Sequence, residues 1–300
     1  MATSDAKKVE KTSFGGMEKK EMNRLKSQKA KSMAEKILIP KIIHLTWKNN
    51  TIPEKWDGVI EAWKKFHPDW KIHFTTDEDN LAYIKKNHPD FLQTYESFPH
   101  NIQRADAIRY FYLRDMGGVY ADMDIMPLGS IQPHLENVTA DALLVYSGNV
   151  KCFTNSFMAS PKNSPFWDEV IDALENPKLP WWAFSPGAKV MYTTGPMMLD
   201  RVAKNYNRPI ALLPSKVFMA YSVNDHHVKK PDAILRPLQG GSWHSWDSKI
   251  AVFLFKWKPF IIALIVAAII AKIVHGRIST KTGLEYPPSD TNLLESGMGA

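Results

Sequence analysis

The chain has 300 residues, enough for one domain of about 200 residues with further segments attached. It is 44% hydrophobic and 23% charged, a balance that excludes disorder along the whole chain. Its single cysteine, Cys152, excludes an intrachain disulfide and a zinc site built from cysteines.

The formal net charge of +7 is concentrated in the first 36 residues, which hold nine Lys and one Arg against five acidic residues. The other 264 residues carry only +2. A basic excess confined to such a leader predicts a solvated tail with a minor role at anionic lipid, so we expect no nucleic-acid partner. No apolar run of about seven residues follows these charges, so no signal peptide is seen.

The folded part is predicted to begin at Ile37. Residues 37–47 are mostly apolar and β-branched, which is typical of a buried strand. We expect a helix over 53–66, a strand over 70–75 and a further helix capped by Asp77. Strands that alternate with helices at this spacing predict an α/β fold with a mainly parallel sheet.

Residues 101–116 are strongly helical in pattern. The apolar positions form one stripe, namely Ile102, Ala105, Ile108, Tyr112 and Met116, and a second face carries Gln103, Asp106, Arg109 and Tyr110. Gly117 and Gly118 then supply the positive φ that ends a helix. We expect further strands over 119–121, 141–147 and 152–159, helices near 164–175 and 196–206, and a loop-rich stretch that ends at 240–246.

An apolar segment follows this domain. Residues 260–271 are all apolar, and the run from 259 to 274 is interrupted only by Lys272. A bilayer span needs about 20 such residues, a length reached by including residues 253–257. Because the segment lacks a polar stripe, a membrane helix is favoured over a buried core helix, with its orientation open. The predicted organisation is a disordered basic leader (1–36), an α/β domain (37–250), a hydrophobic membrane segment (251–275) and a flexible tail (276–300).

The strongest local signal for chemistry is Asp122-Met123-Asp124, directly after a short strand. Two carboxylates two residues apart on an extended segment point to the same side. At the carboxyl edge of a parallel sheet they would face a ligand crevice. Hard oxygen ligands suit Mn²⁺ or Mg²⁺, which neutralise the charge of a leaving diphosphate.

Asp106 and Arg109 stand three apart on the preceding helix, where two interpretations are open. They form an intrahelical ion pair, or Asp106 accepts hydrogen bonds from sugar hydroxyls while Arg109 donates to sugar or phosphate. Trp47 ends the first strand, where it either packs in the core or stacks on a nucleobase. His244 is either a structural hydrogen-bonding residue or a further ligand for the metal ion.

Three blocks of the sequence together resemble the DXD-type glycosyltransferases of family 32. They are Ile39-Pro40-Lys41-Ile42-Ile43-His44-Leu45-Thr46-Trp47, Gln103-Arg104-Ala105-Asp106-Ala107-Ile108-Arg109-Tyr110 and Gly117-Gly118-Val119-Tyr120-Ala121-Asp122-Met123-Asp124. The family includes inositol phosphorylceramide mannosyltransferases and initiating α-1,6-mannosyltransferases. The later Gly-Ser-Trp-His-Ser-Trp stretch, followed by an apolar segment, is most similar to the sphingolipid branch.

The resemblance implies a GT-A fold (a Rossmann-like nucleotide-diphospho-sugar transferase), Mn²⁺ or Mg²⁺ and retention of the anomeric configuration. It implies that Asp122 and Asp124 hold metal and diphosphate, with His244 as third metal ligand. It also implies that Asp106 and Arg109 bind the donor sugar and that Trp47 stacks on the base, which shifts the interpretation of Asp106 and Arg109 from the ion pair to donor binding.

The leading hypothesis is a retaining mannosyltransferase that moves mannose from GDP-mannose to a membrane lipid such as inositol phosphorylceramide. One alternative is a cytosolic or glycan-extending transferase with a UDP-sugar donor, and another is an inactive membrane-anchored adaptor. A Golgi- or ER-type membrane is favoured, although the chain shows only a charged leader where fungal relatives carry a signal anchor.

Overall fold

The computed structural model describes residues 38–147, 151–219, 230–238, 262, 264 and 266–274. The chain divides into two compact units, residues 1–243 and 244–300. The elements of the first unit are β1 (Ile42–Trp47), η1 (Glu54–Trp56), α2 (Val59–Phe66), β2 (Lys71–Thr76), α3 (Asp77–Asn87), η2 (Pro89–Phe91), α4 (Leu92–Ser97), α5 (Asn101–Met116), β3 (Gly118–Ala121), β4 (Ile125–Pro127), η3 (Gln132–His134), β5 (Ala142–Ser147), β6 (Cys152–Ser160), α6 (Pro165–Glu175), α7 (Pro186–Thr193), α8 (Pro196–Asn205), β7 (Ile210–Leu213), α9 (Ser215–Phe218) and β8 (Leu235–Pro237).

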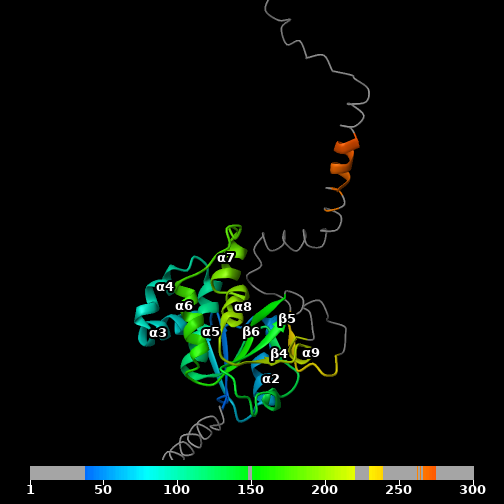
Figure 1. Ribbon diagram of the computed structural model, residues 1–300. Helices are drawn as coiled ribbons and strands as arrows, with labels where there is room; N and C mark the ends of the chain where they lie inside the picture. Colours follow the sequence, from blue (N-terminus) through cyan, green and yellow to red (C-terminus); the bar gives the residue numbers. More distant parts are fainter. Residues whose placement is uncertain are drawn as a thin grey trace, which may run out of the picture. The chain divides into compact units, whose positions relative to one another are not determined.

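A six-stranded sheet with the order β2-β1-β3-β6-β5-β7 forms the centre of this unit (Figure 1). β2, β1 and β3 run parallel, as do β5 and β7, whereas β6 is antiparallel to both of its neighbours. β4 and β8 pair in a small second sheet. The α/β prediction is confirmed, with a mixed sheet in place of a mainly parallel one.

The side chains of β1 and β3 alternate between two hydrophobic cores. Ile43, Leu45 and Val119 pack in the core that includes α2 and α9. Tyr120 points into the other core, which includes α3, α5, α6 and α8, and His44 stacks there on Tyr112 of α5 with ring centroids 5.5 Å apart. The sheet is therefore covered on both faces, which leaves its edges as the places where a ligand could approach the strands.

The helix α5 has the predicted bounds but not the predicted single apolar stripe. Every residue from Asp106 to Leu113 is buried, because the helix packs against the sheet on one side and α6 on another. The residues of the predicted polar face are thus buried too. A polar group in such a position must find a partner inside the protein, which is the starting point for the site described below.

Several local predictions need correction. The predicted helix over 53–66 is broken into η1 and α2, because Gly58 adopts a left-handed φ of 78° between them. The cap of α3 is Thr76 and not Asp77, since the Thr76 hydroxyl accepts a hydrogen bond from the backbone N–H of Asp79, whose carboxylate accepts one from the N–H of Thr76. The helix α7 was not predicted.

Part of the apolar C-terminal segment is described, and residues 266–274 within it are helical. Within the described stretches of the chain, no helix has both the length and the apolar character needed to cross a membrane. The predicted membrane segment begins at residue 251, and residues 251–261 lie outside the described residues, as do the basic leader and the tail. The assignment of 251–275 as a membrane segment therefore stays a prediction.

Candidate functional site

The Arg109 side chain joins the two acidic parts of the predicted site. Its guanidinium lies 2.9 Å from Oδ1 of Asp106 on α5 and 2.9 Å from Oδ1 of Asp122 after β3. The same group donates to the backbone carbonyl of Asn155 at 2.8 Å and lies 4.6 Å from the ring centroid of Tyr120. Arg109 is only 3% exposed, so these contacts fix its orientation.

The charge on Arg109 is maintained by its neighbours. Burial works against the charged guanidinium, but the carboxylate of Asp122, the ring of Tyr120 and the carboxylate of Asp106 outweigh it and raise the pKa of Arg109. A buried cation held between two carboxylates offers a fixed positive charge at the carboxyl edge of the sheet.

Asp106 is the buried end of this network. Its Oδ1 accepts from Asn155 Nδ2 at 3.0 Å as well as from Arg109, and its Oδ2 accepts from the Thr194 hydroxyl at 3.0 Å. Burial raises the pKa of Asp106 to about 6, and the Arg109 charge opposes that rise. The ion pair with Arg109 exists in the structure, and three of the roughly four acceptor positions of the carboxylate are occupied.

Asp122 and Asp124 form the accessible end. One oxygen of Asp122, Oδ1, accepts from Arg109 and from the Tyr120 hydroxyl at 2.9 Å. Within the described part of the chain, the other oxygen of Asp122 and the whole Asp124 carboxylate have no hydrogen bond to a side chain, and the Asp122 side chain is 31% exposed. Burial, then the nearby charge of Asp122, raise the pKa of Asp124 to about 7, and burial also raises the pKa of Asp122.

These features fit a hard divalent cation. Two carboxylates whose ionised forms are disfavoured by burial, with oxygens left over, provide the donor atoms that Mn²⁺ and Mg²⁺ prefer. Among the described residues, however, no group of three or more His, Cys, Asp or Glu side chains could hold a metal ion. The predicted third ligand, His244, lies outside the described residues, so its role stays a prediction.

Trp47 lies at the same edge of the sheet. β1 and β3 are parallel, with His44 opposite Tyr120. Trp47 is the last residue of β1 and Asp122 follows the last residue of β3, so both lie at the carboxyl ends of neighbouring strands. The half-buried indole of Trp47 packs edge-on against Trp56 with centroids 4.5 Å apart and donates to the Thr51 carbonyl at 3.2 Å. It does not contact the Arg109 network, and its stacking on a base stays a prediction.

The sequence predictions missed three polar residues of the network, Tyr120, Asn155 and Thr194. Tyr120 precedes Asp122 by two residues. Because side chains two apart on a strand point to the same side, this spacing could have indicated that Tyr120 lies beside Asp122. Asn155 comes from the antiparallel strand β6 and Thr194 from the end of α7, and neither carries a local sequence signal. Tyr110 joins them, donating from its hydroxyl to the Thr194 carbonyl at 2.8 Å.

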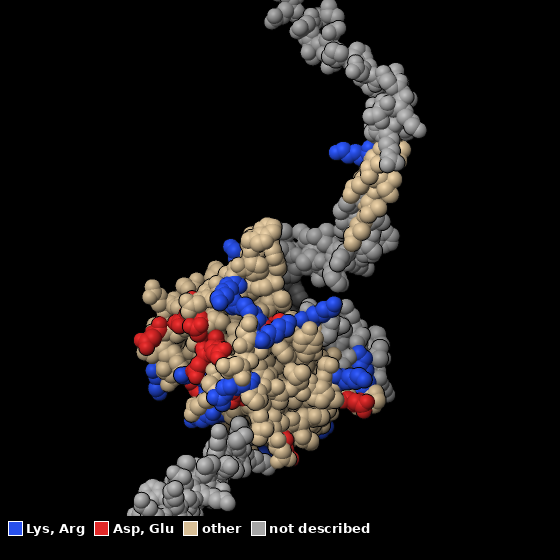
Figure 2. Space-filling view, viewed as in Figure 1, with Lys and Arg blue, Asp and Glu red and all other residues tan. Residues whose placement is uncertain are grey.

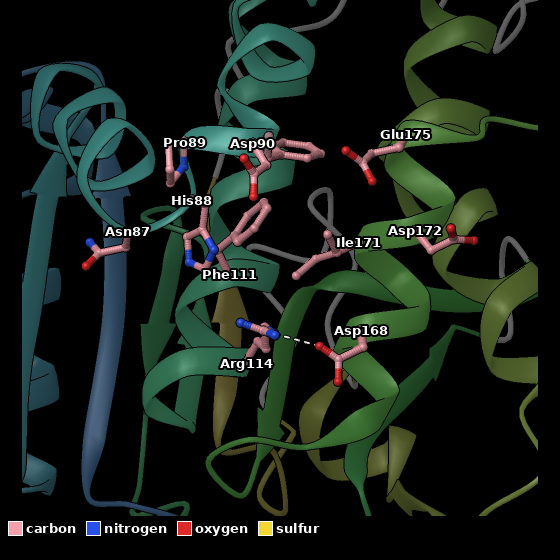
Figure 3. Close-up of a pocket in the computed structure, with 11 residues that line it drawn as sticks. Asn87, His88, Pro89, Asp90, Phe111, Arg114, Asp168, Ile171, Asp172 and Glu175 are labelled. Atoms are coloured by element: carbon pink, nitrogen blue, oxygen red, sulfur yellow. Dashed lines mark hydrogen bonds and ion pairs between the residues drawn. The ribbon is translucent and has the colours of Figure 1, made fainter.

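A cavity of about 310 Å³ lies elsewhere on the same unit, between α5, α6 and the segment that links α3 to η2. Figure 3 shows His88 and Phe111 on one side, and Asp168 on the other, reaching across to Arg114. This cavity lies next to the carboxyl end of α5, which leads into the start of β3. Asp122 and Asp124 follow the other end of β3, so the cavity lies at the opposite edge of the sheet. It includes none of the predicted site residues.

A larger hollow of about 490 Å³ lies at the starts of α3 and α5. It is lined by Asp77, Glu78, Leu81, Tyr95, Glu96, Asn101 and Arg104. α3 follows the carboxyl end of β2, and the backbone N–H of Asp77 donates to the carbonyl of Lys48, the residue after Trp47. This hollow therefore shares the sheet edge at which the predicted site residues gather.

Comparison with known proteins adds an independent observation. Residues 53–142 match the model of a glycosyltransferase sugar-binding region containing a DXD motif. Inositol phosphoceramide mannosyltransferase 3 of Schizosaccharomyces pombe is 35% identical over 232 residues, which are 74% of this chain and 61% of that protein. Mannosyl phosphorylinositol ceramide synthase SUR1 of Saccharomyces cerevisiae is 32% identical, over 71% of this chain and 54% of that protein. The chain thus spans less than two thirds of the length of either relative.

Among solved structures, the PaToxG glycosyltransferase aligns with 61% of this chain and 76% of its own, at 19% identity and a TM-score of 0.44.

Proposed function

We propose that this chain, which carries the sugar-binding region of the DXD-type glycosyltransferases, transfers a hexose from a nucleotide diphosphate sugar to a membrane lipid. The proposed donor is GDP-mannose, the sugar transferred is mannose, and the proposed acceptor is a lipid of the inositol phosphorylceramide type. The names of the relatives above support mannose as the sugar and an inositol-containing ceramide as the acceptor. A GT-A arrangement of the α/β domain is part of the same proposal.

The bridge that Arg109 makes between Asp106 and Asp122 is the observation that carries this assignment. It ties α5 to the segment that follows β3 at the carboxyl edge of the sheet, which places a fixed cation beside the accessible carboxylates of Asp122 and Asp124. Such a combination suits a substrate that has both an anionic diphosphate and a polyhydroxylated sugar.

A divalent cation, when bound, would neutralise charge on the leaving diphosphate. Asp122 and Asp124 would hold it, and Arg109 would keep Asp122 oriented and add positive charge beside the diphosphate. Asp106, with one acceptor position left, would receive a sugar hydroxyl. With retention, the bond between the anomeric carbon and the diphosphate oxygen would break while the acceptor oxygen bonds to the anomeric carbon from the same face. The departing diphosphate oxygen would take the proton of the acceptor hydroxyl.

The test uses the purified full chain with GDP-mannose, Mn²⁺ and inositol phosphorylceramide in mixed micelles, and detects the mannosylated lipid by mass spectrometry. Asp124→Asn is expected to fold normally and to lower turnover by about a hundredfold, because a neutral amide is a weaker ligand for a hard cation. Glu61→Gln, an exposed carboxylate on α2, serves as the matched control and should turn over normally.

The donor base separates the main proposal from its first alternative. Thermal unfolding in the presence of GDP, UDP and their sugars measures base preference, because only a ligand that binds the folded state raises the melting temperature. Stabilisation by UDP-glucose alone would favour the transferase that uses UDP-sugars. An absence of donor hydrolysis with every nucleotide sugar would leave the inactive adaptor and end the enzymatic proposal.

A Golgi- or ER-type membrane is the proposed location. It is supported by the apolar segment over 260–271 and by the lipid acceptors named for the relatives. Protease protection of the tagged full chain in sealed microsomes measures which side of the membrane the α/β domain occupies.

A further inference from the structure

The loop between α6 and α7 exposes a cluster of large apolar side chains, which we name the aromatic loop (Leu179–Phe184). Trp181 is 93% exposed and Phe184 77%, while Trp182 and Leu179 are 46% and 40% exposed. Soluble proteins scatter single apolar residues over their surfaces, but contiguous apolar patches mark sites of interaction. Four such residues within six positions need a partner other than water.

Hydrogen bonds within the aromatic loop fix its backbone conformation. The N–H of Ala183 donates to the Pro180 carbonyl, and the N–H of Phe184 donates to the Trp182 carbonyl, both at 2.9 Å. Ala183 is buried and anchors the turn. Trp182 packs edge-on against Tyr192 of α7 with centroids 5.2 Å apart. The backbone is therefore fixed while the Trp181 and Phe184 rings face outward.

The chain segment that contains the aromatic loop is positively charged. Residues 176–195 contain two lysines, Lys178 and Lys189, and no acidic residue, and both lysines are exposed. Arg201 of α8 donates to the Lys178 carbonyl at 3.5 Å, so a third cation lies beside the loop. Figure 2 shows Lys and Arg side chains next to the uncharged surface over α7. The nearest preceding acid is Glu175, at the end of α6.

The helix α7 connects the aromatic loop to the candidate site. Its eight residues begin at Pro186, directly after the loop, and end at Thr193. Thr193 accepts a hydrogen bond from Gln103 at 2.9 Å, and the next residue, Thr194, donates to Asp106 at 3.0 Å. At 1.5 Å per residue the helix is about 12 Å long, so the loop and the site lie one short helix apart.

We infer that the aromatic loop docks the α/β domain onto an anionic lipid bilayer, with the Trp181 and Phe184 rings in the interfacial layer and the lysines on lipid phosphates. Tryptophan favours the membrane interface, where its ring is apolar and its N–H meets the headgroups. Basic residues near the surface add attraction to anionic lipid. Docking through the loop would hold the site at headgroup level.

A bilayer fits this surface better than a folded protein does. The complementary charge is phosphate, and a ring that protrudes with 93% of its surface exposed enters a fluid interface without a preformed pocket. The inference goes beyond the proposed transfer reaction, because docking is measured without any substrate.

Docking is measured with an environment-sensitive fluorophore on the full chain. Cys152 is the sole cysteine and is buried, so Phe184→Cys provides one reactive thiol on the loop. Lys64→Cys, an exposed position on α2, provides the matched control. Vesicles of phosphatidylcholine with phosphatidylserine, containing a lipid with a headgroup nitroxide, should quench the label at 184 and leave the label at 64 unchanged. Vesicles of phosphatidylcholine alone should quench the label at 184 less.

Four results would overturn the inference. The first is equal quenching of the two labels, and the second is no quenching of either label. The third is shielding of the label at 184 that depends on protein concentration in the absence of vesicles. The fourth is a response of that label to GDP-mannose but not to vesicles. The third result would identify a second copy of the chain as the occupant, and the fourth a loop that closes over the donor.

A second variant tests the consequence for catalysis. Trp181→Ser removes an exposed ring that supports no core packing, so folding and donor hydrolysis should be unchanged. Transfer to acceptor lipid in vesicles should fall about tenfold, as expected from the apolar area withdrawn from the interface. Equal loss of donor hydrolysis would show that Trp181 acts inside the donor site and would contradict docking. This arm rests on the proposed function, whereas the quenching experiment does not.

Discussion

Arg109 illustrates how one side chain serves both folding and the candidate chemistry. As a buried cation, it would be costly without its carboxylates, and each carboxylate would be costly without it. The alternatives that the sequence left open, an ion pair or a ligand-binding pair, therefore describe the same geometry. The ion pair with Asp106 is formed, and a second ion pair places Arg109 beside Asp122, a residue proposed to hold metal and diphosphate.

Replacing Arg109 by Lys tests the geometry of this bridge rather than its charge. A single ammonium cannot reproduce a planar fork that reaches Asp106, Asp122 and the Asn155 carbonyl together. We expect Arg109→Lys to weaken GDP-mannose binding about ten- to a hundredfold, the range for lost hydrogen bonds to charged groups, as measured by calorimetry. Arg114→Lys, an arginine of the same helix outside the site, is the matched control, and unchanged donor affinity in Arg109→Lys would return Arg109 to a purely structural role.

The buried His44 leads to a prediction about how the stability of the fold depends on pH. Its Nε2 lies 2.8 Å from the Gly117 carbonyl and its Nδ1 lies 2.9 Å from Nδ1 of His73, so Nε2–H donates to the carbonyl and Nδ1 accepts from His73. Burial lowers the pKa of His44 to about 3 from its ordinary 6.5. The unfolded chain therefore binds a proton at pH 5 that the folded chain does not.

The resulting stability is present in full above pH 6.5 and is lost progressively as the pH falls toward about 3. We expect the free energy of unfolding to drop by about 2 kcal/mol from this residue between pH 6.5 and pH 5. Urea denaturation of the parent chain and His44→Asn at both pH values isolates the effect, because titrating groups that do not contact His44 cancel in the difference. His134→Asn is the control, and equal pH dependence in parent and His44→Asn would contradict the prediction.

At the scale of elements, the junction between α5 and β3 positions the site. Gly117 and Gly118 have φ values of 64° and 95°, which carry the chain from the end of the helix into β3, the strand that Asp122 follows. A Cβ on Gly118 would lie 2.6 Å from the Ile42 carbonyl oxygen. The glycines therefore serve both the backbone conformation and the close approach of β3 to β1.

Gly118→Ala is expected to lower the free energy of unfolding by more than the strained φ alone explains. A left-handed residue with a side chain costs about 1–2 kcal/mol, and the clash with the Ile42 carbonyl adds to this. Gly58→Ala is the matched control, because Gly58 has a φ of 78° and open space around its Cβ position. Chemical denaturation should show a larger loss of unfolding free energy for Gly118→Ala, and equal losses would mean that the strands separate freely at this point.

Elements with a strong local pattern were predictable and those fixed by tertiary contacts were not. The bounds of α5 follow from its period and from the two glycines after it. By contrast, the burial of its polar face depends on Asn155 and Thr194, which are distant in sequence and approach Asp106 only in the folded chain. The antiparallel direction of β6 likewise depends on how the chain connects the strands, and no local sequence pattern indicates it. The sequence predicted two pairs, Asp106 with Arg109 and Asp122 with Asp124, and the structure joins these pairs through Arg109.

At the scale of the whole molecule, the described chemistry belongs to the first unit. The network extends from α5 through β3 to β6 and the end of α7, all within residues 1–243. The apolar run over 260–271 belongs to the second unit and carries no ligand-type side chain. Donor binding and anchoring by this segment are therefore expected to be separable by truncation.

A chain that ends after Asp247 should be soluble, should bind GDP-mannose as the full chain does and should hydrolyse it at a similar rate. Transfer to lipid in vesicles should fall much further than hydrolysis, because an anchor confines the enzyme to the surface that holds the acceptor and so raises its local concentration. The ratio of the two rates, measured in one vesicle preparation for both chains, gives the contribution of the anchor. An insoluble or unfolded truncation would mean that residues 251–274 complete the core, and the preference for a lipid acceptor would lose the support of this segment, leaving the aromatic loop to account for contact with the membrane.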